Sequence, residues 1–72
     1  MTVKLFATFR EGRFKVEERD YPAGATCGQI VSALGLLEDE LGIVLVNSRH
    51  APLEQELKAG DTVSLFPLVG GG

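Results

Sequence analysis

The residues with the clearest chemical potential stand at the carboxyl end of the chain, where Gly70, Gly71 and Gly72 follow the run "FPLV". Glycine loses more conformational entropy on ordering than any other residue and has no side chain to pack, so three terminal glycines contribute little to folding. They provide a free carboxylate on a thin backbone. We therefore expect residues 1–69 to form a folded domain and residues 70–72 to form a flexible tail of the diglycine type.

Two other side chains could do chemistry, the single cysteine Cys27 and the single histidine His50. One cysteine cannot form an internal disulfide, and one residue of each type does not make a metal-ligand cluster of the usual spacing. Cys27 falls in the first turn of a predicted helix, where packing is the favoured interpretation and a reactive thiol the alternative. We therefore predict no metal site and assign no chemical role to either residue.

The composition limits the class of function. A single domain of 72 residues has little room for a sizeable internal active site. The formal charge of −3 offers no basic field for phosphate backbones, so nucleic acid is not an expected partner. No apolar stretch approaches the roughly 20 residues of a membrane span or forms a signal peptide, so we expect no membrane partner and a cytoplasmic location.

The amino-terminal half predicts a hairpin followed by a helix. The stretch "TVKLFATFR" alternates apolar and polar residues with Phe6 as the exception, Glu11 and Gly12 can form a tight turn, and "RFKVEE" alternates again. Thr26 followed by Gln29 is a capping-box pattern. The expected helix starts there, ends or bends near Gly35, and carries one apolar stripe consisting of Ile30, Leu34 and Leu37.

The carboxyl-terminal half predicts two more strands. The run 43–46 is apolar throughout, so it should lie inside the sheet, whereas "SRHAP" indicates a turn and "LEQELKAGD" a short irregular or helical segment. The stretch "TVSLFPLV" predicts a final strand parallel to the first. The fold class is α+β, a mixed sheet on one helix. Its core is predicted to contain Val3, Leu5, Phe14, Val16, Ile30, Leu34, Val63 and Leu65.

On this arrangement Phe6 and Phe66 fall on the opposite, uncovered face of the sheet. They would lie beside either Ile43 and Leu45 or Val44 and Val46. Exposed apolar patches of this kind usually contact another protein. The alternative is imperfect alternation with partial burial. The acidic run 38–40 is most simply a solvated face, with steering of a basic partner surface as the alternative.

Three stretches resemble the MoaD/ThiS family of ubiquitin-like β-grasp sulfur carriers, and especially MoaD, the small subunit of molybdopterin synthase. The opening "LFATFRE" is similar to the first strand of that family, and "VLVN" stands where the family has its third strand. Leu68 replaces a second proline that is common in MoaD, and the chain is nearer to ThiS in length. The most specific stretch, "LKAGDTVSLFPLVGGG", keeps the spacing of Leu57, Gly60, Asp61, Val63, Phe66, Pro67, Gly71 and Gly72.

The resemblance implies a ubiquitin-like β-grasp fold with four to five strands on one main helix. It implies that an adenylating enzyme of the MoeB/ThiF type, related to the ubiquitin activators, uses ATP to activate the carboxylate of Gly72. That carboxylate becomes a thiocarboxylate, a 1-thioglycine, while Gly70 and Gly71 thread the enzyme's narrow site. The chain would then be a sulfur carrier with no tightly bound cofactor, and not itself an enzyme.

The same resemblance implies the partners. Besides the activating enzyme these are a sulfurtransferase or cysteine desulfurase and a MoaE-type large subunit, in which the catalysis of molybdopterin synthesis resides. The docking residues would be Phe6, Phe66, Pro67 and Leu68. Three alternatives stay open: a ThiS-like carrier for the thiamin thiazole, a ubiquitin-like modifier that forms isopeptide bonds to lysines, and a non-reactive β-grasp binding module. A tungsten-pterin pathway would use the same carrier as a molybdenum pathway.

Overall fold

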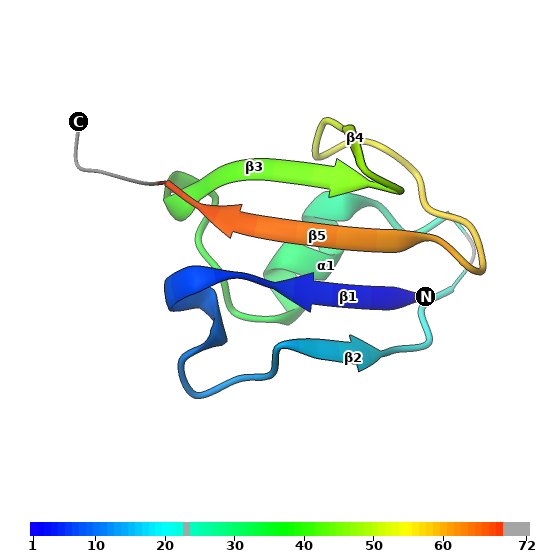
Figure 1. The fold of residues 1–72 in the computed structure, drawn as a ribbon. Coiled ribbons are helices and arrows are strands. Elements are labelled where there is room, and N and C mark those ends of the chain that lie inside the picture. The colour runs from blue at the N-terminus through cyan, green and yellow to red at the C-terminus, as the bar shows by residue number, and fades with distance from the viewer. Residues whose placement is uncertain (23, 69–72) are drawn as a thin grey trace.

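A computed structural model of the chain describes residues 1–22 and 24–68, which form one sheet packed on one helix (Figure 1). The strands lie in the order β2-β1-β5-β3-β4, and α1 crosses one face of the sheet. None of the described helices is long and apolar enough to span a membrane. The described elements are β1 (Thr2–Leu5), the 3₁₀-helix η1 (Ala7–Arg10), β2 (Val16–Glu18), α1 (Cys27–Ala33), the 3₁₀-helix η2 (Glu38–Glu40), β3 (Leu41–Val46), β4 (Arg49–His50) and β5 (Thr62–Pro67).

The centre of the sheet is the predicted parallel pair, β1 beside β5. The run 43–46 lies inside the sheet, as predicted, because β3 pairs with β5 on one side and β4 on the other. β4 falls within the segment predicted as a turn. The chain reverses earlier, at Asn47 and Ser48, whose φ values of +51° and +69° suit a two-residue hairpin turn, and this leaves Arg49 and His50 free to pair back onto β3.

The helix begins as predicted. The Thr26 side chain accepts from the Gln29 backbone N–H, and the Gln29 side chain accepts from the Thr26 N–H, which completes the capping box. Leu34 is the C-cap, and the chain then turns at Gly35, whose φ of +75° favours glycine. The prediction for Leu37 was wrong: its side chain is 63% exposed because the helix has already ended, and Leu36 is buried instead.

The amino-terminal hairpin differs from the prediction. β1 ends at Leu5, and the next residues form η1, in which the Arg10 side chain donates to the Leu5 carbonyl over 2.9 Å. The second strand is only three residues long. Val16 lies opposite Lys4 and is 59% exposed, whereas Glu17 lies opposite buried Val3. The irregular backbone before β2 shifts its alternation by one residue, so placing Val16 in the core was wrong.

The core is a single apolar layer between the sheet and α1. Phe14 and Leu34 are half-buried and pack against its edge. Cys27 belongs to this core, and burial raises the pKa of its thiol, which opposes reactivity. Eight side chains are completely or almost completely buried: Val3, Leu5, Cys27, Ile30, Val31, Leu57, Val63 and Leu65.

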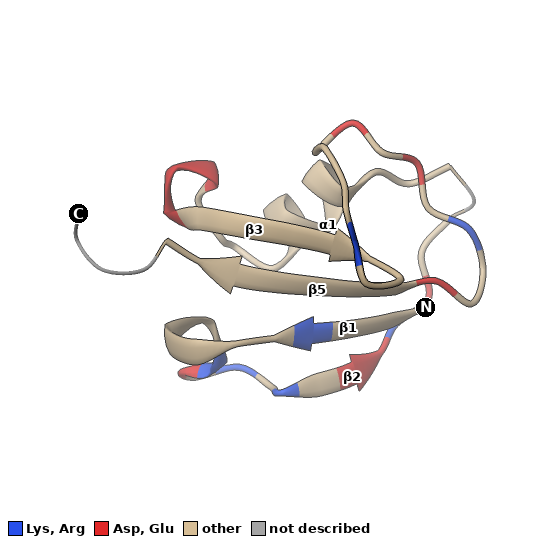
Figure 2. Ribbon diagram, turned by 45° about the horizontal axis from the view of Figure 1, so that its top comes forward, with Lys and Arg blue, Asp and Glu red and all other residues tan. Residues whose placement is uncertain are grey.

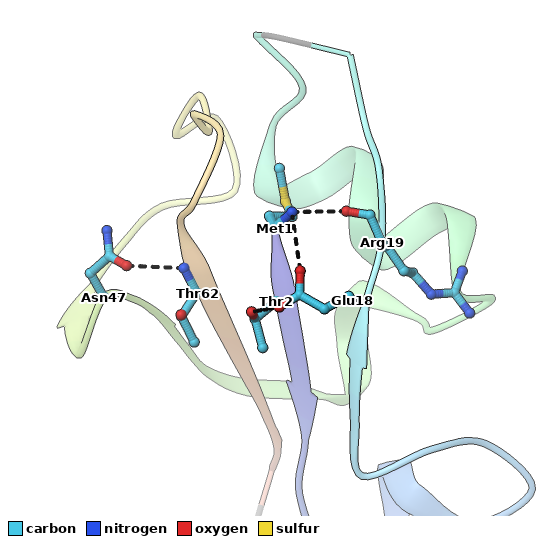
Figure 3. A network of polar contacts seen from close by, with 6 residues as sticks. All are labelled: Met1, Thr2, Glu18, Arg19, Asn47 and Thr62. Atoms are coloured by element: carbon cyan, nitrogen blue, oxygen red, sulfur yellow. Dashed lines mark hydrogen bonds and ion pairs between the residues drawn. The ribbon is translucent and has the colours of Figure 1, made fainter.

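Polar contacts fasten the end of the sheet where β1 and β5 begin (Figure 3). The Met1 ammonium donates to the Arg19 carbonyl over 2.9 Å. The Asn47 Oδ1 atom accepts from the Thr62 N–H over 2.9 Å, which ties the β3–β4 turn to β5. Asp61 accepts from the Lys58 N–H over 2.8 Å and from the Asn47 Nδ2 atom over 2.9 Å. These two bonds hold the pKa of the Asp61 carboxyl below its usual value.

We predict that Asp61 makes the stability of the domain depend on pH. Because the pKa of Asp61 is lower in the folded state, its contribution is present above the unfolded value of about 3.9 and is lost as the pH falls through the folded value. Urea unfolding of the wild type and Asp61→Ala should therefore differ at pH 7 and converge in acid. Asp61→Asn, which keeps one acceptor oxygen, should lose less unfolding free energy at pH 7 than Asp61→Ala. An equal difference in unfolding free energy between the wild type and Asp61→Ala at pH 7 and pH 2 would contradict the prediction.

Candidate functional site

The predicted reactive end of the chain continues from the end of β5. Gly70, Gly71 and Gly72 lie outside the described residues, so the described part of the site is the place from which they emerge. The last described residue, Leu68, is 65% exposed, and its N–H donates to the Glu40 carbonyl over 2.8 Å. Pro67 lies opposite Leu41 and is buried. The end of β5 is therefore attached to the start of β3.

Phe6 and Phe66 lie together on the open face of the sheet, as predicted. Their rings stack with a centroid distance of 4.1 Å and an interplanar angle of 8°. The Phe6 N–H donates to the Leu65 carbonyl over 3.2 Å, which holds the residue beside β5 after β1 has ended. The Arg10 guanidinium lies 5.4 Å from the centre of the Phe6 ring. Both rings are half-buried, and each shields one face of the other.

The sheet register decides which residues of β3 extend this aromatic pair. Ile43 lies opposite Phe66 and is 42% exposed, and Leu45 lies opposite Ser64. Val44 lies opposite Leu65 and is buried. Of the two alternatives left open by the sequence, the structure thus selects Ile43 and Leu45. We call Phe6, Ile43, Leu45 and Phe66 the open-face patch.

The predicted docking residues Pro67 and Leu68 have different positions. Pro67 follows the alternation of Val63 and Leu65, so its side chain is buried toward the helix face and contributes to the end of the strand. Leu68 is exposed next to the patch-bearing end of β5. The described part of the site therefore has two apolar features, the open-face patch and the exposed Leu68.

Charged residues flank the end of β5 (Figure 2). The three acidic residues of η2, Glu38, Asp39 and Glu40, are exposed on the β3 side. Arg10 at the end of η1 lies on the β1 side, where its side chain donates to the Leu5 carbonyl. Within residues 1–22 and 24–68, no three His, Cys, Asp or Glu side chains gather as metal ligands.

Sequence reasoning did not single out Gly42, the residue of β3 that faces the end of β5. A β-bulge interrupts the register between Leu41 and Ile43, and an added Cβ at Gly42 would lie 2.7 Å from the Pro67 carbonyl oxygen. The available signal was a glycine at the start of an otherwise apolar strand, which often marks a bulge or a close backbone approach.

Comparison with known proteins gives a family for the chain. The model of the ThiS family matches residues 3–72, which include the terminal glycines. No curated protein sequence matches the chain.

Solved structures share the fold over nearly the whole chain. Small archaeal modifier protein 1 of Haloferax volcanii is 32% identical, with a TM-score of 0.75 over 94% of this chain and 95% of that one. A Pyrococcus furiosus protein named as a molybdopterin converting factor, subunit 1, is 31% identical, with a TM-score of 0.76. The match covers 94% of this chain and 95% of that one. The Helicobacter pylori complex of subunits 1 and 2 of molybdopterin-converting factor, at 23% identity, has a TM-score of 0.57 over 99% and 96%, and it shows the fold alone. The predicted ubiquitin-like β-grasp fold is confirmed.

We predict that Phe6 and Phe66 are energetically coupled in the free domain. Stacked aromatic pairs contribute about 0.5 to 1.5 kcal/mol beyond the area that they bury. Urea unfolding gives the loss of unfolding free energy in Phe6→Ala, in Phe66→Ala and in the double variant. The sum of the two single losses should exceed the loss in the double variant by that amount. Val16→Ala, at an exposed position on the edge strand β2, which β1 separates from β5, is the control and should show no coupling to Phe66→Ala. Additive losses for the two phenylalanines would show that the stacking contributes nothing to stability.

Proposed function

The chain belongs to the ThiS family of ubiquitin-like carriers, and from this we propose that it is a sulfur carrier whose reacting group is the carboxylate of Gly72. The observation that carries the proposal is the family match over residues 3–72, since it includes the reactive end as well as the globular domain. The described domain then serves as the part that partner enzymes recognise. The chain supplies the group that reacts, and its partners supply the catalysis.

The proposed chemistry follows from the low reactivity of a carboxylate. An activating enzyme of the MoeB/ThiF type would let the Gly72 carboxylate attack the α-phosphorus of ATP, with release of pyrophosphate and formation of an acyl-adenylate. The terminal sulfur of a persulfide on a sulfurtransferase or cysteine desulfurase would attack the carbonyl carbon and displace AMP, giving an acyl disulfide. A second thiol would then reduce this acyl disulfide, leaving a thiocarboxylate on the chain and a disulfide between the two thiols. Gly70 and Gly71 present no Cβ atoms, so they suit passage through a narrow enzyme channel.

The open-face patch supports a role in docking. Its aromatic and aliphatic side chains lie on the sheet face that α1 does not cover, at the end from which residues 69–72 emerge. An enzyme that receives the terminus would contact this face next to its own active site. We infer that the same surface meets the activating enzyme first and then a MoaE-type large subunit.

The favoured pathway is molybdopterin synthesis, for a molybdenum or tungsten cofactor in the cytoplasm. Support comes from the 31% identity to the Pyrococcus furiosus protein named as a molybdopterin converting factor, subunit 1. The stretches "LFATFRE" and "FPLV" also resemble MoaD more than ThiS. Sulfur transfer to the thiamin thiazole is the alternative destination for the same thiocarboxylate.

A second function, protein modification, is favoured by a separate observation. The chain is 32% identical to the small archaeal modifier protein 1 of Haloferax volcanii over almost all of both chains. The same acyl-adenylate that accepts sulfur can react with an amine, through transfer to a lysine and formation of an isopeptide bond. Modification would produce a ladder of covalent adducts on cellular proteins, which a carrier devoted to sulfur transfer would not.

We predict that the terminal glycines determine reactivity without affecting folding. Deletion of Gly72, Gly71→Val and an added carboxyl-terminal tag should each abolish ATP–pyrophosphate exchange by the cognate activating enzyme. The deletion removes the carboxylate from its position, valine obstructs the channel, and the tag converts the carboxylate to an amide. Thermal unfolding should be unchanged within error, because all three variants keep every buried apolar side chain of the described residues.

The products distinguish the candidate functions. With the intact chain, a sulfur donor and the activating enzyme, the mass should rise by one sulfur-for-oxygen exchange. Full adenylation of the Gly72 deletion would refute the carrier proposal. Adenylation of the intact chain without thiocarboxylate would favour the protein modifier, and wild-type behaviour of all three variants in binding would favour a non-reactive module.

We predict that Phe66→Ala and Phe6→Ala weaken binding to the activating enzyme more than they weaken folding. An aromatic anchor at an interface contributes about 2 kcal/mol or more, equivalent to roughly a thirtyfold rise in Kd. Isothermal titration calorimetry of the folded variants measures this change. Val16→Ala removes a more exposed apolar side chain, from the edge strand β2, and should bind like the wild type. Unaltered binding by both phenylalanine variants would exclude the patch as a docking surface.

A further inference from the structure

Gly42 makes a close backbone contact that no other residue type could make without displacement. A Cβ atom built on Gly42 would lie 2.7 Å from the Pro67 carbonyl oxygen, 3.0 Å from the Pro67 carbonyl carbon and 3.1 Å from the Leu68 Cα atom. All three neighbours are backbone atoms, so they cannot rotate away as a side chain would. Gly42 is not among the described residues with positive φ, so glycine is needed here for space and not for conformation.

The other described glycines do not share this property. An added Cβ at Gly28, in α1, would meet the Leu53 carbonyl oxygen at 3.4 Å, an ordinary contact. At Gly12, Gly35 and Gly60 no atom lies within 4 Å, and their positive φ values account for the choice of residue. Among the described glycines, the tight contact at Gly42 therefore lies at the end of β5.

The same place is fixed by hydrogen bonding. Leu68 N–H donates to the Glu40 carbonyl over 2.8 Å, and the β-bulge between Leu41 and Ile43 lets Gly42 lie beneath the Pro67–Leu68 peptide. Contacts with Glu40 of η2 and with Gly42 of β3 thus set the direction of the backbone at Leu68. In the proposed function Gly72 is the reacting residue, and the four residues from 69 to 72 span at most about 14 Å when fully extended. So short a segment cannot compensate for a large displacement at its base.

We propose that Gly42 is a positioning residue for the reaction at the carboxyl terminus: its missing side chain lets Pro67 and Leu68 lie against β3 and so directs Gly72 into the partner's active site. The inference rests on the proposed function, in which Gly72 supplies the reacting carboxylate. Gly42 touches no reacting atom and acts through the backbone of Pro67 and Leu68. In this proposal the open-face patch binds the partner, and Gly42 sets the direction in which the residues after Leu68 enter its active site.

The test compares Gly42→Ala and Gly42→Val with the matched control Gly28→Ala. ATP–pyrophosphate exchange by the cognate activating enzyme gives kcat and KM for each full-length chain, and NMR hydrogen exchange gives the protection of the Leu68 amide. Misplacement of a reacting group by about 1 Å can lower a rate a hundredfold. We expect kcat to fall about tenfold for alanine and further for valine, with KM changed less than about threefold because Phe6 and Phe66 are intact. The Leu68 amide should exchange faster than in the wild type in both Gly42 variants, and at the wild-type rate in Gly28→Ala.

Two outcomes would overturn the inference. Wild-type kcat in Gly42→Ala together with rapid exchange at Leu68 would show that the attachment does not matter for the reaction. Unchanged protection of Leu68 in both Gly42 variants would show that the contact does not fix the backbone there. Alanine adds a single carbon, so it serves as the test where valine prevents folding. Failure of the proposed function is distinguishable, because the wild-type chain would then not be adenylated at all.

Discussion

The pairing of β5 with β1 on one side and β3 on the other is the interaction on which the rest of the molecule depends. β5 is the last strand in sequence and the middle strand in space. Val63 and Leu65 are completely buried beneath α1, while Phe66 emerges on the opposite face. β5 therefore both completes the core and carries the chain to the end of the sheet. Folding of the domain thus also fixes the point at which the chain leaves β5.

The stacking of Phe6 on Phe66 limits the apolar area that the open-face patch exposes to water. Two phenylalanines on an uncovered sheet face would be costly in water, but stacking at 4.1 Å removes one face of each ring from solvent, and Arg10 lies over Phe6. The part of the patch that stays accessible is small. Under the proposed function, a partner would gain its affinity from this limited area and from the terminal residues together, which suits binding that is specific but short-lived.

The sequence predicted the features that depend on local pattern. The Thr26–Gln29 capping box, the end of the helix near Gly35 and the shared face of Phe6 and Phe66 were all confirmed. The errors arose where tertiary pairing overrides alternation. Nothing local to "RFKVEE" indicates that irregular backbone precedes β2, and a shift of one residue was enough to move Val16 from the core to the open face. Gly42 was missed because its role depends on Pro67, 25 positions away in the sequence.

The arrangement also constrains the order of events if the proposed function holds. Phe66 is only six residues from Gly72, so a partner that holds the terminus in its active site must cover the same sheet face as any other such partner. Two enzymes cannot occupy that face together, and sulfur loading and sulfur delivery would have to alternate through the free carrier. The fold itself does not select the acceptor of the activated carboxyl group. Whether sulfur or a lysine amine attacks is decided by the nucleophile that the bound partner admits, which explains how one β-grasp domain can suit both carriers and modifiers.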